Sequence, residues 1–334
     1  MHLVLNSFGA SIRKENGLFA VSTAAGKQMI PPADVTSISV SKGARISSDA
    51  VLLAIEHEID VLFVDGLGKP QGRVWSIRYG SISSIRRSQV EFLFSPRSVE
   101  WARDLVDEKI NNQIALLLAL NVGQDERTER LLRYAINSME DHRGKIRKLE
   151  GESVSDISPT LRGWEGAASK RYFEALSACL PEGYRFEKRS RQPAEDRFNA
   201  MLNYAYGMLY GKVEGALIKA GLDPYTGIFH RDDYNRPALV FDVIEKYRIW
   251  ADYVVVQLCR QEAMSEECFS ETEGLGLMLD GLGKRILIQS VNDYLAEVIE
   301  LNGLRRSRQE HIQRQAFELA SLFQKAAQPM PDNE

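Results

Sequence analysis

A histidine and two carboxylates near the middle of the chain have the types and spacing of a cation site. His230 follows a turn-rich loop that begins near Gly221 and Pro224, and Asp242 and Glu245 lie further along the chain, three residues apart. Residues three apart on a helix project from the same face, so one cation could meet both carboxylates. An imidazole among carboxylates is a ligand set for a divalent metal ion.

A simpler interpretation of the acidic pair is a solvated helix face, which is the usual meaning of acids opposite an apolar stripe. Ile249 and Val256 project from the same side as the acids. Their position indicates that another part of the chain covers this face. Spacing alone leaves both interpretations open.

A third carboxylate, Glu165, lies upstream in a segment with helical periodicity. At 100° per residue it falls beside Tyr172, Phe173 and Leu176, on or next to the apolar side of its helix. A buried carboxylate needs a metal ion, a basic side chain or a proton as its partner. The alternative to a metal is therefore an ion pair, with Arg171 or another base.

Two helices and a loop must position His230 and the acidic pair. The first helix opens at Asp196 and stops at Gly221, with Pro224 just beyond. The second starts at Pro237, and its apolar stripe continues through Val254. The segment 151–161, rich in serine, predicts a connection that leads into the helix of Glu165.

The candidate residues belong to four motifs, in a fixed order between residues 163 and 248. They are Gly163-Trp164-Glu165-Gly166-Ala167-Ala168, Arg191-Gln192-Pro193-x-x-Asp196-x-x-Asn199-Ala200-x-Leu202-x-Tyr204-x-Tyr206-Gly207, Gly221-Leu222-Asp223-Pro224-Tyr225-x-Gly227-x-x-His230 and Leu239-Val240-x-Asp242-x-x-Glu245-x-Tyr247-Arg248. In order, spacing and residue type, this set resembles the CRISPR-associated integrase family, Cas-one.

The resemblance implies a site and its chemistry. In that family a glutamate, a histidine and an acid bind the divalent ion that cuts and joins DNA. The matching catalytic positions here are Glu165, His230 and Asp242, with Glu245 as a nearby acid and further candidate metal ligand. The ion would be Mg²⁺ or Mn²⁺, which would activate a water or a DNA 3′-hydroxyl and neutralise charge on the phosphate.

The resemblance also implies a function: a metal-dependent DNA endonuclease and integrase that inserts captured double-stranded DNA as spacers into a CRISPR array. Inserting a duplex requires two attacks, so at least two copies of the chain are expected, and the family's small partner, Cas-two, would bridge two dimers. Two alternatives stay open. They are a different metal-dependent nuclease or phosphoesterase, and a DNA-binding scaffold without catalysis.

Composition limits the remaining possibilities. The chain has 334 residues, 44% of them hydrophobic, and no run long enough to span a membrane. Its N-terminus lacks the pattern of a secretory signal, so a cytoplasmic location is expected. The three cysteines have no metal-binding spacing.

DNA binding must be local, because the formal net charge is −4. The best-placed basic group precedes the helix that opens at Asp196, and it consists of Arg185, Lys188, Arg189 and Arg191. Two further groups are Arg73, Arg78, Arg86 and Arg87, and Arg143, Lys145, Arg147 and Lys148. Each such group could equally be a solvated face.

The periodicity predicts an α+β protein with two domains. Residues 1–84 contain short apolar segments separated by turn residues, and they are expected to form a small β-rich domain that builds a twofold homodimer. Residues 85–334 have helical periodicity and are expected to form an all-helical catalytic domain, apart from a possible small hairpin over 274–288.

Overall fold

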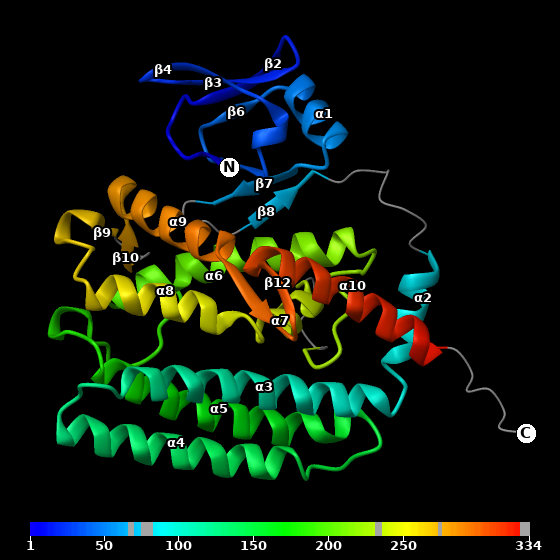
Figure 1. Ribbon diagram of the computed structural model, residues 1–334, viewed down its shortest axis with the longest axis vertical. Coiled ribbons are helices and arrows are strands. Elements are labelled where there is room, and N and C mark those ends of the chain that lie inside the picture. Colours follow the sequence, from blue (N-terminus) through cyan, green and yellow to red (C-terminus); the bar gives the residue numbers. More distant parts are fainter. Residues whose placement is uncertain (66–69, 75–82, 231–235, 273–275, 328–334) are drawn as a thin grey trace, which may run out of the picture. The chain divides into compact units, whose positions relative to one another are not determined.

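The computed structural model describes residues 1–65, 70–74, 83–230, 236–272 and 276–327. The chain divides into two compact units, Met1–Gly80 and Ser81–Glu334 (Figure 1). The division lies close to the domain boundary expected after residue 84. Strands dominate the first unit and helices the second, so the predicted α+β class and the order of the two parts agree with the structure.

Unit 1 contains two four-stranded sheets. One has the order β1 (His2–Leu5), β5 (Ser37–Ser41), β7 (Asp60–Val64), β8 (Pro70–Arg73), in which only β8 runs antiparallel to its neighbour. The other has the order β4 (Gly26–Ile30), β3 (Leu18–Thr23), β2 (Ser11–Glu15), β6 (Arg45–Ile46). A short turn, η1 (Pro32–Asp34), precedes β5.

The core of unit 1 lies where helix α1 (Ser48–Glu56) meets β2 and β7. Ile12, Phe19 and Ile38 are fully buried there. Ser47 starts the helix, because its Oγ accepts a hydrogen bond from the Ala50 amide at 3.2 Å. The strand β2 was not predicted, since Ser11–Glu15 has only one fully buried side chain in its sequence SIRKE and therefore lacks an apolar signal.

Unit 2 is built mainly from nine helices in the part of the chain that is described. They are α2 (Ser83–Phe92), α3 (Arg97–Leu120), α4 (Glu126–Ile146), α5 (Val154–Ala178), α6 (Arg197–Lys219), α7 (Ala238–Ile244), α8 (Arg248–Arg260), α9 (Gly281–Ala296) and α10 (Arg308–Ala327). Helices α3, α4 and α5 all contact one another as a three-helix bundle, and α6, α8, α9 and α10 form a second layer (Figure 1). Because α3 also contacts α8, it connects the two layers.

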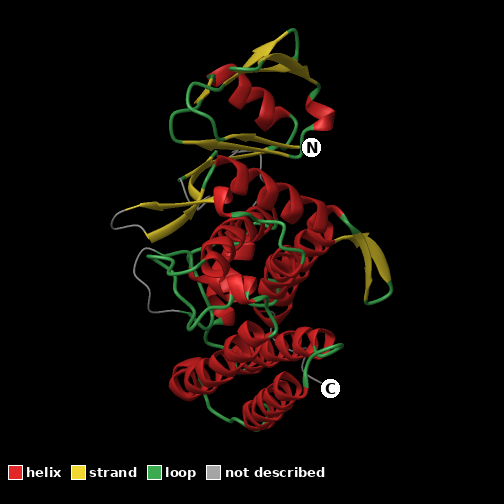
Figure 2. Ribbon diagram, turned by 90° about the vertical axis from the view of Figure 1, so that its left-hand side faces the viewer, coloured by secondary structure: helices red, strands yellow, loops and turns green. Residues whose placement is uncertain are grey.

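Unit 2 also contains short strands and turns. The prediction that this part of the chain is all-helical is therefore wrong. Two hairpins lie at its margin, β9 (Phe269–Thr272) with β10 (Gly276–Leu279) and β11 (Val298–Leu301) with β12 (Leu304–Ser307) (Figure 2). Two short turns are η2 (Glu182–Tyr184) and η3 (Glu266–Cys268). The predicted hairpin over 274–288 is wrong in its second half. Asp280 accepts hydrogen bonds from the Leu282 and Gly283 amides and starts helix α9 there.

The helix of Glu165 begins earlier than the sequence indicated. Ser153 and Asp156 form a reciprocal capping box, in which each side chain accepts a hydrogen bond from the other's backbone amide, so α5 starts at Val154. Most of the expected connection 151–161 is thus helical. Pro159 lies inside α5, although it lacks a backbone N–H. None of the helices in the described ranges is long and apolar enough to cross a membrane.

Candidate functional site

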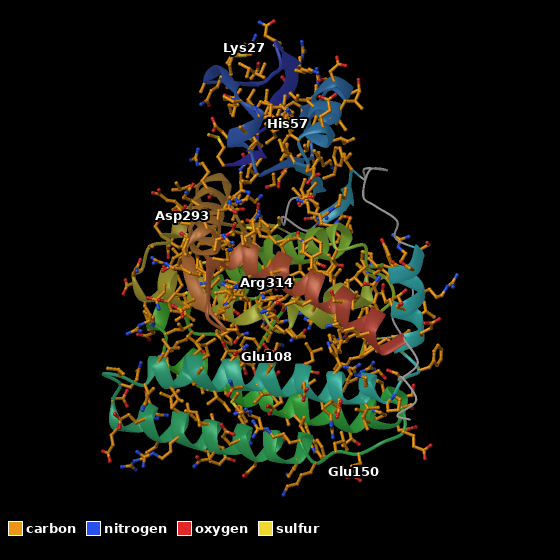
Figure 3. All side chains as sticks on the ribbon, turned by 45° about the vertical axis from the view of Figure 1, so that its right-hand side comes forward. Lys27, His57, Glu108, Glu150, Asp293 and Arg314 are labelled. Carbon is orange, nitrogen blue, oxygen red and sulfur yellow. The ribbon has the colours of Figure 1, made fainter. Side chains whose placement is uncertain are left out.

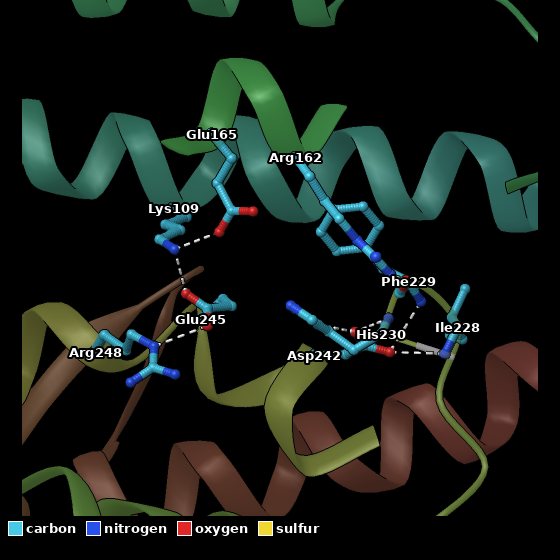
Figure 4. A network of polar contacts seen from close by, with 9 residues as sticks. All are labelled: Lys109, Arg162, Glu165, Ile228, Phe229, His230, Asp242, Glu245 and Arg248. Atoms are coloured by element: carbon cyan, nitrogen blue, oxygen red, sulfur yellow. Dashed lines mark hydrogen bonds and ion pairs between the residues drawn. The ribbon is translucent and has the colours of Figure 1, made fainter. Parts of the chain in front are cut away.

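Two glutamates from different helices share one lysine in the middle of unit 2. Glu165 projects from α5, Lys109 from α3, and Glu245 from the end of α7 (Figure 4). The Lys109 Nζ lies 2.5 Å from Oε1 of Glu165 and 2.6 Å from Oε2 of Glu245. The side chain of Lys109 is only 11% exposed, that of Glu165 13% and that of Glu245 7%, so these groups are largely withdrawn from water.

A second base holds the other oxygen of Glu245. The Arg248 Nε donates to Oε1 at 2.8 Å, whereas Oε2 is buried and has no correctly directed hydrogen bond despite its short contact with Lys109. Burial acts to raise the pKa of Glu245, but Arg248 and Lys109 outweigh it and lower the pKa to about 2. Burial likewise acts to lower the pKa of Lys109, and the two carboxylates reverse the effect and raise it. Lys109, Glu245 and Arg248 therefore stay charged at neutral pH.

A break between helices α7 and α8 positions Glu245. The sequence predicts one helix from Pro237 past Val254, but α7 ends at Ile244. The amides of Glu245 and Tyr247 bond to carbonyls three residues back, those of Asp242 and Ile244, which tightens the chain into a turn. The acids at 242 and 245 consequently point to different partners. Within the described part of the chain, no basic side chain contacts both acids, although residues three apart on a continuous helix would share one face.

Asp242 is fully buried and holds His230 in place. Its Oδ1 accepts from the His230 amide at 3.0 Å and lies 2.7 Å from the ring Nδ1, while Oδ2 accepts from the amides of Ile228 and Phe229 at 2.6 and 3.1 Å. A carboxylate offers about four lone-pair sites, and all of them are used here. The structure therefore gives Asp242 no free lone pair with which to bind a metal ion directly.

The imidazole of His230 extends from Asp242 on the side that faces Glu165 and Glu245 (Figure 4). Burial acts to lower the His230 pKa, but the hydrogen bond and charge of Asp242, together with the charges of Glu245 and Glu165, raise it. With Nδ1 bonded to Asp242, the ring nitrogen on the glutamate side is Nε2. A histidine whose Nδ1 is held by a carboxylate is oriented to offer Nε2 as a ligand.

In this structure, the metal ligands expected from the sequence do not surround one common position. Among the described residues, no three His, Cys, Asp or Glu side chains lie close enough together to hold a metal ion. The residues nevertheless fit a cation, since Lys109 already lies between two carboxylates and Glu245 Oε2 is a buried acceptor without a hydrogen bond. Two carboxylate oxygens and an imidazole nitrogen are donors that Mg²⁺ or Mn²⁺ accepts.

The solvated-face interpretation of the acidic pair is wrong. Asp242 is 0% exposed and Glu245 7%, and Val256, which the sequence placed on their side of one continuous helix, is fully buried. The alternative ion pair proposed for Glu165 exists, but its base is Lys109 and not Arg171, which pairs with Glu174 at 3.0 Å. Lys109 was missed, although it lies four residues after Leu105 and three after Val106, on the buried face of α3. A lysine within an apolar stripe was the available signal.

Of the four predicted DNA-binding residues, Arg189 is used inside the protein. Its guanidinium donates to Asn199 Oδ1 and Asn203 Oδ1, each at 2.6 Å, and stacks 5.5 Å from the Tyr206 ring. Burial lowers its pKa. These internal bonds occupy donors of the guanidinium that a phosphate contact would need.

The other three predicted DNA-binding residues are exposed. Lys188 pairs loosely with Glu195 at 3.3 Å, Arg185 donates to the Leu180 carbonyl at 3.1 Å, and Arg191 lies on the surface. In the two other basic groups, Arg143 and Arg147 both bind Asp107, and Arg78 lies outside the described residues.

A buried network behind Arg248 was not foreseen. Asp252 is 1% exposed and accepts hydrogen bonds from the hydroxyls of Tyr172, at 2.7 Å, and Tyr206, at 2.5 Å. The Arg248 guanidinium lies 4.6 Å from the centre of the Tyr206 ring. Through these contacts α5, α6 and α8 fix the base that holds Glu245.

Unit 1 has no comparable cluster among its described residues. His57 lies at the C-terminal end of α1 (Figure 3), and no group of potential metal ligands surrounds it. The candidate site is therefore confined to unit 2, in an α+β protein whose helical part gathers acids, bases and one histidine.

Comparison with known proteins identifies the family of the chain. The family described as CRISPR associated protein Cas1 matches residues 3–293. The "CRISPR-associated endonuclease Cas1 1" of Archaeoglobus fulgidus is 31% identical over 316 residues, which are 91% of this chain and 90% of that protein. The chain belongs to the Cas1 family.

Solved structures share the fold at lower sequence identity. A casposase bound to integration product matches with a TM-score of 0.80 and 21% identity, over 100% of this chain and 94% of that one. A chain of a Cas6-RT-Cas1–Cas2 complex also matches with a TM-score of 0.80 and 21% identity, over 98% of this chain. This chain corresponds to only 35% of that larger polypeptide.

Proposed function

We propose that this chain is a divalent-metal-dependent DNA endonuclease and integrase, which inserts captured DNA segments as spacers into a CRISPR array in the cytoplasm. One observation supports this most: in a member of the Cas1 family, Glu165 and Glu245 converge on a single cation position beside an oriented His230. Relatives carry the name endonuclease, and the casposase of the same fold was solved with an integration product.

The ligands that we propose for Mg²⁺ or Mn²⁺ are Glu165, Glu245 and Nε2 of His230. Asp242 is assigned a different role from the one expected: it fixes the ring and tautomer of His230, as carboxylates behind metal-binding histidines do. Glu245 takes the position of direct ligand instead. When bound, the ion would activate the attacking oxygen and stabilise negative charge on the scissile phosphate.

Basic side chains position one proposed ligand and supply charge for binding DNA. Arg248 holds Glu245 Oε1 at 2.8 Å and so directs Oε2 toward Glu165 and Lys109. The exposed Arg185, Lys188 and Arg191 precede the α6 helix and supply positive charge for the DNA backbone. No serine or cysteine nucleophile is required by this chemistry.

Duplex insertion needs more than one copy of the chain. A chain with one site performs one strand transfer at a time, whereas a duplex has two ends to join. We propose a homodimer through the strand-rich unit 1 and a bridge between two dimers by the small Cas2 partner. A polypeptide that contains the same fold was solved in a Cas6-RT-Cas1–Cas2 complex.

Substitution of the three proposed ligands tests the function. Glu165→Gln, Glu245→Gln and His230→Ala should each reduce cleavage and joining of a labelled duplex by at least about a hundredfold with Mn²⁺ or Mg²⁺. Circular dichroism should show unchanged folding. Glu174→Gln, on the same helix as Glu165 but paired with Arg171, is the matched control and should keep its activity. Undiminished joining by a folded Glu165→Gln protein would reject the site, and DNA binding without any cleavage by the wild type would favour the scaffold alternative.

A further inference from the structure

Lys109 occupies the position between the two glutamates that a metal ion requires. It makes short contacts with both carboxylates, and its side chain is 11% exposed. No other described base contacts both acids, since Arg248 reaches only Glu245. We propose that Lys109 is a resident counter-cation of the active site, whose ammonium group the divalent ion displaces on binding. This inference rests on the proposed function, because it assumes that Glu165 and Glu245 are metal ligands.

The charge balance of the cluster explains why such a cation is present. Glu165 and Glu245 contribute two negative charges to a largely buried site, and Lys109 and Arg248 contribute two positive ones. Without Lys109, two carboxylates would face each other with one base between them. A buried, uncompensated charge is strongly destabilising, so the lysine keeps the site assembled in the absence of metal.

The geometry makes the two cations compete for the same carboxylate oxygen. Lys109 Nζ lies 2.6 Å from Glu245 Oε2, the oxygen that is not used by Arg248. An ion at about 2.1 Å from the same oxygen would lie at most about 4.7 Å from Nζ. A dication and an ammonium at that distance in a poorly hydrated site repel strongly. The ion can enter only when the long, flexible lysine side chain swings out.

This exchange has two consequences. The affinity for the metal is lower than that of the same ligands without Lys109, because each binding event must break the two ion pairs of Lys109. The displaced ammonium also remains tethered on α3 and becomes accessible to solvent. Both consequences can be measured without any assay of DNA cleavage.

Affinity is measured by isothermal titration of the full chain with Mn²⁺, after removal of metal by a chelator. Lys109→Met keeps the length of the side chain and removes its charge, and it should tighten Mn²⁺ binding by about tenfold or more. Lys246→Met is the matched control. Lys246 is adjacent to Glu245 in sequence but pairs with Glu108 on α3, at 2.8 Å, instead of with Glu165. The Mn²⁺ affinity of Lys246→Met should stay within about twofold of the wild type, because this substitution changes the net charge of the protein without removing a contact to Glu165 or Glu245.

Displacement is measured on the unmodified protein, so the test does not depend on the folding of Lys109→Met. A small amine-acylating reagent and peptide mass spectrometry report the labelling rate of each lysine. Labelling of Lys109 should be slow with chelator, rise on addition of Mn²⁺ and fall again when chelator is restored, while labelling of Lys246 stays constant.

Opposite outcomes are distinguishable. Equal or weaker Mn²⁺ affinity in folded Lys109→Met, or labelling of Lys109 that Mn²⁺ leaves unchanged, would overturn the exchange. If Glu245→Gln and Glu165→Gln still bind Mn²⁺ as tightly as the wild type, the proposed ligand set itself fails. Loss of binding in those two variants together with unchanged affinity in Lys109→Met would refute the role of Lys109 alone.

Discussion

The Asp242 carboxylate lies 2.7 Å from Nδ1 of His230 and also accepts three backbone hydrogen bonds from residues 228–230. One buried side chain thereby fixes both the histidine ring and the loop that presents it. Lone pairs occupied in this way are not available to a metal ion. In the proposed site, Asp242 is therefore the residue that orients His230, whereas the sequence had suggested that it binds the metal directly.

Replacement of Asp242 by asparagine tests this separation. An amide keeps one acceptor oxygen, so some of the four bonds are lost and the ring is held less firmly. Mn²⁺ affinity should fall by about 10- to 100-fold, as it does when a partner behind a ligand is changed. Unfolding should also become easier by about 1–3 kcal/mol, because a buried backbone amide loses its acceptor. Isothermal titration and urea unfolding measure the two effects. Unaltered stability together with complete loss of metal binding would instead make Asp242 a direct ligand.

Acid should weaken the fold through Glu245. Its pKa is about 2 in the folded protein and near 4.5 when unfolded, so the unfolded chain binds the proton more readily. The contribution to stability is therefore fully present above about pH 4.5 and disappears as the pH falls toward 2. Urea unfolding of wild type and Glu245→Gln, in chelator, should differ most at neutral pH and converge in acid. A difference that does not change with pH would contradict the ion pairs assigned to Glu245.

The exposed and buried arginines before α6 should behave differently in DNA binding. Joint replacement of Arg185, Lys188 and Arg191 by glutamine should weaken binding and lower the salt slope by about 0.9 for each phosphate contact removed. Thermal stability should be unchanged. Arg189→Gln should mainly lower the melting temperature, because its bonds to Asn199 and Asn203 are internal. An unchanged salt slope in the triple variant would place the DNA elsewhere on the surface.

Self-association through unit 1 can be measured without DNA. Multi-angle light scattering of the full chain at micromolar concentration should give twice the mass of 37.7 kDa. The open edges of the two sheets in this unit are β1, β4, β6 and β8, and Met29 on β4 is 39% exposed. Met29→Lys should weaken a dimer that uses the β4 edge, because a charge on an edge strand disfavours pairing. A wild-type protein that is strictly monomeric yet joins both ends of a duplex would refute the dimer.

The sequence by itself determined the division into a strand-rich and a helical part, and most helix positions in the latter. Helix α6 starts after Asp196 and ends before Gly221 as expected, because an N-cap carboxylate and a glycine at φ +82° are local signals. The hairpin turn at Asn16 and Gly17, both with positive φ, is local in the same sense. The Cas-one resemblance likewise rested on residue types at fixed spacing.

Only the tertiary structure decided which partners each candidate site residue has. Glu165 and Lys109 are 56 residues apart and belong to α5 and α3, so no local pattern could pair them. The roles of Asp242 and Glu245 depend on the turn after Ile244, where hydrogen bonds three residues back send the two carboxylates to different partners. Arg189 differs from the exposed Arg185, Lys188 and Arg191 because it bonds to Asn199 and Asn203 of α6, and this too is set by tertiary packing. Burial and partner choice are set by which helices pack together, and that information lies in contacts between segments that are distant in the sequence.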